Sequence, residues 1–118
     1  MTASPQETYT PDKWLIVKVT NTTDNTSHYR VFASWYGGYL GADAWKLNSG
    51  ITKVTENIDY YFFEGASGST YVCHKGSYGS NGYGSGVLAN LIKKSKESNM
   101  VIEPLDADVD PMTLEVKE

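Results

Sequence analysis

The chain has 118 residues, of which 40% are hydrophobic and 20% are charged, a composition that is ordinary for one globular domain. Its single cysteine, Cys73, cannot form an intrachain disulfide, so a disulfide-stapled secreted scaffold is excluded. The longest apolar stretches, at 14–17 and 60–63, are far too short to span a bilayer. Residues 1–12 lack the apolar core of a signal peptide, so we expect a cytoplasmic protein.

The formal net charge of −4 is unevenly distributed along the chain. Two acids give residues 1–12 a charge of −2, and nine Lys or Arg against five acids give residues 13–96 a charge of +4. Seven acids against one Lys give residues 97–118 a charge of −6. We therefore predict a flexible N-terminal arm at 1–12, one globular domain at 13–96 and an acidic tail at 97–118. The tail either solvates a flexible end, competes with nucleic acid or docks on a basic partner.

Alternating apolar residues predict a β-hairpin at the start of the domain. Leu15, Val17 and Val19 fall on one face of a strand, and the polar residues 21–27 have the composition of a turn. Residues 28–36 carry apolar side chains on both faces, which indicates a central strand.

A second hairpin is expected after two short strands at 45–47 and 51–54. The aromatic run at 60–64 is a strong strand signal, and residues 70–74 follow it after a Gly/Ser turn. These two segments are therefore predicted to pair.

One helix is expected at 86–96, after a loop at 76–86 that is rich in Gly, Ser and Tyr. Ser85 is its expected N-cap. Its apolar face consists of four residues at helical spacing: Val87, Leu88, Leu91 and Ile92. Because this face needs a sheet to cover, we predict an α+β, mainly β fold, either a twisted antiparallel sheet or a small SH3-like barrel with one C-terminal helix. The tail can be disordered, add an edge strand or insert into a partner. We expect it to be extended and weakly held, with strand-like alternation at 113–117.

Few residues are suited to catalysis or metal binding. The candidate soft ligands are His28, Cys73 and His74, but they lack paired zinc-ligand spacing, and adjacent strand residues point to opposite faces. A GxSxG elbow is absent, and a Cys–His pair is less favoured than a buried Cys73 beside an exposed His74. The Gly-rich loop lacks the Walker and GxGxxG spacings, which leaves a connector, a partner contact or a phosphate site as its alternatives. We expect no enzyme, no metal and no cofactor.

The aromatic residues give the most informative signal for function. The chain has nine Tyr, three Trp and three Phe, more than one small core needs. The core candidates are Trp14, Trp35, Tyr61, Phe63 and Tyr71. Tyr in Gly-flanked loops offers a large contact area at low entropic cost. The candidate partner contacts are therefore Tyr36, Tyr39, Tyr78 and Tyr83, with the acids Asp106, Asp108 and Asp110 as a second patch. These tyrosines can equally be ordinary turn and sheet-surface residues.

Nucleic acid is the alternative partner, because aromatic rings interleaved with cations can stack on single strands. The residues that would carry this binding are Arg30, Lys46, Lys53, Lys75, Lys93 and Lys94. In that case the acidic tail would compete with nucleic acid for the basic body, and binding would depend steeply on salt.

A resemblance to known proteins rests on three features of the sequence. These are the segment 45–51, the rings of Tyr61 and Phe63, and the pattern Gly65-x-Ser67-Gly68-Ser69-x-Tyr71-x-Cys73. They resemble short accessory proteins encoded by phages and prophages of enteric bacteria and, more loosely, SH3-like small barrels. The resemblance implies a protein that binds and inhibits a host enzyme or defence complex, and it carries over no functional residues. We therefore expect a non-enzymatic protein-binding module whose partner is a host protein or another copy of the chain.

Overall fold

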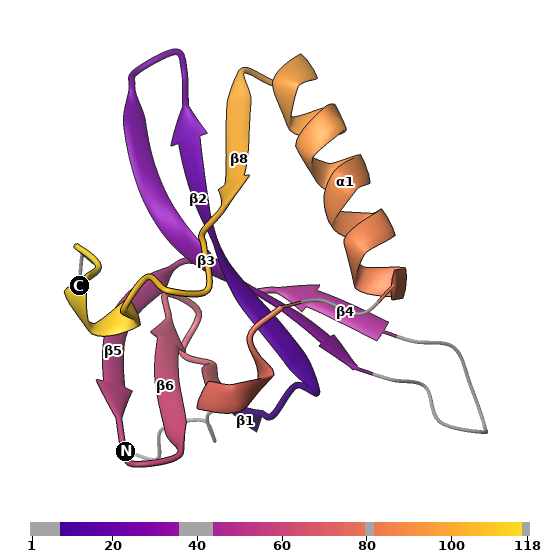
Figure 1. The fold of residues 1–118 in the computed structure, drawn as a ribbon. Coiled ribbons are helices and arrows are strands. Elements are labelled where there is room, and N and C mark those ends of the chain that lie inside the picture. Colours follow the sequence, from indigo (N-terminus) through magenta and orange to yellow (C-terminus); the bar gives the residue numbers. More distant parts are fainter. Residues whose placement is uncertain (1–7, 36–43, 80–81, 117–118) are drawn as a thin grey trace, which may run out of the picture.

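The computed structural model describes residues 8–35, 44–79 and 82–116 of the chain. In this part of the chain, eight strands form two four-stranded sheets (Figure 1). The first sheet has the order β1 (Thr8–Tyr9), β7 (Thr70–His74), β6 (Tyr60–Gly65) and β5 (Ile51–Glu56). The second has the order β4 (Ala44–Leu47), β3 (Thr26–Trp35), β2 (Lys13–Asn21) and β8 (Met100–Pro104). The helix α1 (Gly82–Glu97) packs on the second sheet, on the face away from the first.

Both predicted hairpins are confirmed. β2 and β3 pair antiparallel in one unbroken register from Lys13↔Ser34 to Asn21↔Thr26. β6 and β7 pair antiparallel from Tyr60↔His74 to Glu64↔Thr70. The short strands expected at 45–47 and 51–54 correspond to β4 and β5.

The core between the two sheets is rich in aromatic side chains. Its buried members are Trp14, Ile16, Val31, Ala33, Ile51, Phe63, Tyr71 and Cys73. The Trp14 ring contacts Phe63 and Tyr61, and its indole N–H donates to the carbonyl of His74 at 2.7 Å. The core predictions are confirmed for Trp14, Phe63 and Tyr71, while Trp35 and Tyr61 pack against the same cluster but stay partly exposed.

A second, mostly aliphatic cluster fills the space between the second sheet and α1. Its buried members are Leu15, Val17, Val19, Phe32 and Leu88. The predicted apolar face of the helix is confirmed, since Val87, Leu91 and Ile92 also pack here. Strands β2 and β3 therefore have buried side chains on both faces, which the sequence indicated for β3 but not for β2.

The α+β, mainly β fold class is confirmed, but the SH3-like barrel is not. The two sheets face each other without closing, because their outer strands do not pair with one another. The helix also begins at Gly82 rather than at residue 86, so Ser85 is not its N-cap. Glycine accepts helical dihedrals at a cost of about 1 kcal/mol, so Gly82 and Gly84 can lie in the first turn of the helix.

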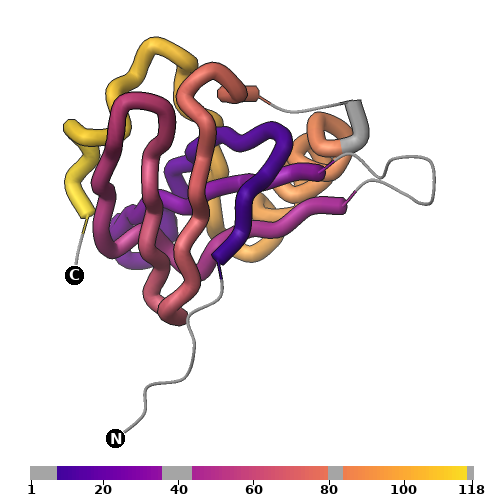
Figure 2. The backbone as a smooth tube through the Cα atoms, turned by 90° about the horizontal axis from the view of Figure 1, so that it is seen from below, coloured from indigo at the N-terminus to yellow at the C-terminus, as the bar shows by residue number. Residues whose placement is uncertain are grey.

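The segment expected as a weakly held tail is largely part of the fold. β8 pairs antiparallel with β2, from Val17↔Pro104 to Asn21↔Met100. The following chain runs beside β5, through the short 3₁₀-helix η2 (Pro111–Thr113) (Figure 2). Leu105, Leu114 and Val116 pack against the inter-sheet core. The alternation at 113–117 does not produce a strand in residues 113–116, because its apolar side chains cover the edge of the sandwich instead.

The end of the expected N-terminal arm is also attached to the body. β1 pairs in parallel with β7, and the ring of Tyr9 contacts the rings of Trp35 and Tyr71. The indole N–H of Trp35 donates to the carbonyl of Thr10 at 3.0 Å. The folded unit therefore extends on both sides of the predicted boundaries at 13 and 96.

Candidate binding groove beside strand β3

The two halves of β3 differ in what lies along their outer edge. On its inner edge β3 pairs with β2 over its whole length. On its outer edge only Phe32 to Trp35 pair with β4. Next to that ladder, Asn48 takes over as the partner of Val31: the Asn48 N–H donates to the Val31 carbonyl at 3.0 Å, and the Val31 N–H donates to Asn48 Oδ1 at 2.9 Å.

Alternation along the strand shows which backbone groups are left open. Both backbone groups of Val31 point to the outer edge, so those of Tyr29 and Ser27, two and four residues earlier, point there as well. Within the described residues, no hydrogen bond joins the N–H and C=O groups of Ser27 and Tyr29 to another segment. The half of β3 from Thr26 to Arg30 is thus an exposed strand edge.

A cavity of about 880 Å³ lies against this edge. Its lining comes from β3 and the preceding turn, from the start of β5 with the loop before it, and from the C-terminal segment. The lining residues are Lys18, Asn25, Thr26, Ser27, His28, Tyr29, Arg30, Ser49, Gly50, Ile51, Thr52, Ala66, Glu115 and Val116. We call this cavity the β3 groove. Its volume is in the upper part of the range for ligand sites.

Three basic side chains line the β3 groove: Lys18, His28 and Arg30. The Arg30 Nε–H donates to His28 Nε2 at 2.9 Å, which requires that nitrogen of His28 to be unprotonated. Burial first, and the positive charge of Arg30 second, lower the pKa of His28 below its ordinary value of 6.5. Among the described lining residues, Glu115 is the one carboxylate.

The turn that supports the groove depends on Asn48 and Gly50. Buried Asn48 accepts hydrogen bonds at Oδ1 from the N–H groups of Val31 and Gly50. Its Nδ2 is buried and has no hydrogen-bond partner among the described residues, so no hydrogen bond offsets the desolvation of this group. Gly50 has a φ of 129°, a conformation that other residues rarely adopt, and it lies beside the ring of His28.

The predicted loop tyrosines do not come together in the described structure. Tyr36 and Tyr39 lie outside the described residues, and only the backbone of Tyr83 is placed, in the first turn of α1. Tyr78 has a structural position instead. Its Oη donates to the Leu105 carbonyl at 2.7 Å and accepts from the Ile16 N–H at 3.2 Å, and its ring contacts that of Trp14. Tyr78 thus has a structural role, and its partner contact stays a prediction.

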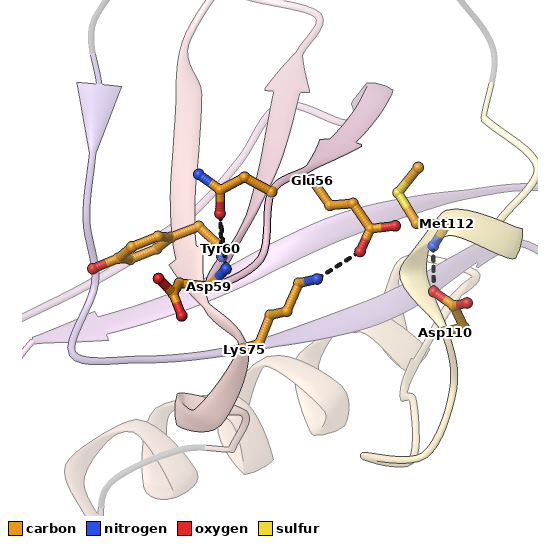
Figure 3. A network of polar contacts seen from close by, with 7 residues as sticks. Glu56, Asp59, Tyr60, Lys75, Asp110 and Met112 are labelled. Carbon is orange, nitrogen blue, oxygen red and sulfur yellow. Dashed lines mark hydrogen bonds and ion pairs between the residues drawn. The ribbon is translucent and has the colours of Figure 1, made fainter.

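The predicted acidic patch is exposed and lies beside another polar network. Asp106, Asp108 and Asp110 are all exposed, and Asp110 caps η2 by accepting from the Met112 N–H at 3.0 Å. Lys75 and Glu56 form an ion pair of 2.6 Å close by (Figure 3). This ion pair and the nearby Asp110 raise the pKa of Lys75, with the hydrogen bond to Glu56 as the largest cause.

The basic residues of the nucleic-acid alternative are dispersed. Arg30 and Lys46 belong to the second sheet, Lys53 and Lys75 to the first sheet and its end, and Lys93 and Lys94 to α1. Lys75 is paired with Glu56, and Lys46 lies 5.0 Å from the ring centroid of Tyr9. Because three layers carry these six side chains, they do not form one continuous basic track.

Cys73 and His74, which were considered for chemistry, lie in different environments. Cys73 is fully buried, and burial raises the pKa of its thiol, which disfavours the nucleophilic thiolate. His74 is exposed and accepts from the Gly76 N–H through Nδ1, so the expected buried Cys73 beside an exposed His74 is confirmed. Among the described residues, no group of three or more His, Cys, Asp or Glu is close enough to hold a metal ion.

Sequence reasoning selected Arg30 but missed Lys18, Ser27, His28 and Tyr29 as members of one groove. A partial signal was present, because residues 26–30 are the polar end of a strand whose other half is apolar. That pattern shows exposure, but it cannot show which backbone edge lacks a partner.

Comparison with protein-family models, curated proteins and solved structures found no match to this chain. None of the helices in the described residues is long and apolar enough to cross a membrane.

Proposed function

We propose that this protein is a non-enzymatic binding module that takes an extended segment of a partner protein onto the open edge of β3. The observation that carries the proposal is the run from Thr26 to Arg30, where a strand with unpaired backbone groups faces the β3 groove. Strand addition of this kind uses main-chain hydrogen bonds for affinity and flanking side-chain contacts for specificity.

Two features make this edge suited to binding. β2 holds β3 in register over its whole length, so the open half is already in strand conformation and little ordering entropy opposes binding. An exposed strand edge is also a hazard for aggregation, and proteins commonly cover such edges. Here the edge of β5 is covered by the C-terminal segment, whereas the edge of β3 is left open.

The chemistry of the described residues favours binding over catalysis. The thiol of Cys73 is buried in the core, and the one close polar side-chain pair in the groove is Arg30 with His28. An inhibitory role toward a host enzyme and a phage origin stay predictions from the resemblance. Partner contacts by Tyr36, Tyr39, Tyr78 and Tyr83 stay predictions from the composition of their loops.

The test is a selection of binders from a library of random twelve-residue peptides, followed by two matched variants. Ser27→Pro removes the outward N–H of Ser27 without removing a hydrogen bond to β2, whereas Ser27→Ala keeps that N–H. We expect selected peptides to bind wild type and Ser27→Ala alike, and to lose at least tenfold in affinity toward Ser27→Pro. We also expect them to slow hydrogen exchange at the amides of Ser27 and Tyr29.

Selected peptides that bind all three proteins equally, and leave those two amides unchanged, would contradict the proposal. A library that yields no binder would contradict it too. Because Ser27→Pro can disturb the hairpin, its amide spectrum must retain the wild-type signals of β2 and β8. The exchange measurement on the wild-type protein gives the same answer independently of that variant.

A further inference from the structure

We infer that the β3 groove selects an extended peptide whose side chains carry carboxylates. This inference rests on the proposed function and names the chemical class of its partner. It starts from the charge of the lining, which has Lys18 and Arg30 as permanent cations and Glu115 as its one described carboxylate.

Both cations are available to a ligand. In the described part of the chain, neither Lys18 nor Arg30 forms an ion pair. Arg30 uses its Nε–H on His28, which orients the guanidinium and leaves its terminal N–H groups free. Such groups bind carboxylates in a paired, charge-assisted geometry.

The positions of the two cations fit an added strand. Lys18 lies opposite Tyr29 across β2 and β3, so both are on the face toward the first sheet. Arg30 lies opposite Val17 and is on the other face. Successive side chains of an added strand also alternate between these faces, so carboxylates on either face can meet a cation.

Three hydroxyl groups of the lining, those of Thr26, Ser49 and Thr52, contribute less to this selection. The Thr26 hydroxyl donates to Asp24, that of Thr52 donates to the Glu64 carbonyl, and that of Ser49 donates to Ser67. Their protons are therefore already used within the chain. Lys18 and Arg30 are therefore the groups that distinguish ligands by their charge.

Charge also argues against a second copy of the chain as the occupant. Two β3 edges paired antiparallel would bring Lys18 and Arg30 of both copies to one shared groove. Like charges opposite each other destabilise a strand pair. An acidic segment removes this repulsion and neutralises both cations.

The test uses three acetylated and amidated ten-residue peptides, with Thr alternating with Glu, Gln or Lys, titrated into the ¹⁵N-labelled full chain. We expect the Glu peptide to bind at least tenfold more tightly than the Gln peptide, and the Lys peptide to bind most weakly. The advantage of Glu over Gln should shrink several-fold between 20 mM and 500 mM salt. Bound peptide should slow exchange at the amides of Ser27 and Tyr29 but not at those of His28 and Arg30, which are already bonded to β2.

Matched variants locate the selection. Arg30→Gln and Lys18→Gln should each reduce the advantage of Glu over Gln, whereas Glu115→Gln should increase it. Lys94→Gln makes the same change of charge on α1, away from the groove, and should leave the advantage unchanged. An equal effect of Lys94→Gln would overturn the inference, because only the total charge would then matter.

Three other results would overturn the inference. Equal binding of the Glu and Gln peptides, with Ser27 and Tyr29 protected, would remove the charge selection and leave the proposed function standing. Failure of all three peptides to protect these amides would contradict both. Tighter binding of a ten-nucleotide oligothymidylate than of the Glu peptide, without protection of these amides, would assign the groove to nucleic acid.

Discussion

The two halves of strand β3 share one partner but have opposite environments. From Val31 onward the strand is in the core: Val31, Phe32 and Ala33 are fully buried, and the outer edge pairs with Asn48 and β4. From Thr26 to Arg30 no side chain is buried, and the outer edge faces the groove. The core half thus anchors the open half, which gains a fixed strand conformation without being buried itself.

The largest expected difference between the halves is in side-chain burial. Phe32→Ala should lower the free energy of unfolding by about 3–5 kcal/mol, because it empties a fully buried site between β3 and α1. Arg30→Ala, two residues away in the open half, should change it by about 0.5 kcal/mol or less. Urea unfolding of both variants measures this, and similar losses would show that the open half is also part of the core.

The next effect concerns the point where the halves meet. Asn48→Ala should lower the free energy of unfolding by about 1–3 kcal/mol, because the N–H groups of Val31 and Gly50 lose their acceptor. Hydrogen exchange of the Val31 amide should also speed up, because the open edge of β3 would then include Val31. Asn90→Ala, an exposed change on α1, is the control and should cost nothing. An unchanged Val31 amide would show that Asn48 does not close the edge.

A backbone substitution beside the groove should have a similar or smaller effect. Gly50→Ala places a side chain at a φ of 129° and should cost about 1–3 kcal/mol. Gly86→Ala, in the exposed part of α1 with open space around it, should instead stabilise by about 0.5–1 kcal/mol. Thermal unfolding of the pair gives the sign of each change, and the same sign for both would contradict the assigned backbone strain.

The smallest effect is a pH dependence from the open half. Burial and Arg30 lower the pKa of His28, so between that lowered value and 6.5 the unfolded chain binds more protons than the folded one. Stability from this group is complete above pH 6.5 and is lost as the pH falls below it. His28→Gln keeps an acceptor for Arg30 and should flatten this slope in urea unfolding between pH 7.5 and pH 5. An unchanged slope would show that a group other than His28 causes the pH dependence of stability.

The sequence alone was sufficient for the elements whose pattern is local. Alternation in β2 and the aromatic run of β6 predicted both hairpins, because period-two burial is visible within a few residues. An edge strand was one alternative for the tail, but β8 was not located. Its five residues include an acid and a proline, and only pairing with the distant β2 makes them a strand.

The candidate site was mostly beyond prediction for a related reason. The groove exists because β4 stops pairing at Phe32 and the chain then turns through Asn48, which is a property of topology rather than of composition. Tyr78 shows the same limit. Gly-rich neighbours indicated a surface loop, but its hydroxyl is fixed by Ile16 and Leu105, which are 62 and 27 residues away.

The pairing of β2 with β8 also sets an order of events during synthesis. The pairs Asn21↔Met100 and Val17↔Pro104 join residues roughly eighty positions apart in the chain. β3 ends at Trp35 and β8 at Pro104, so at translation rates of about 5–20 residues per second β8 is complete roughly 3–14 seconds after the β2–β3 hairpin. During that interval one edge of β2 has no partner strand and is open to pairing with other nascent chains. In the cell, the yield of this protein should therefore depend on chaperones that shield nascent strands, more than its final stability would suggest.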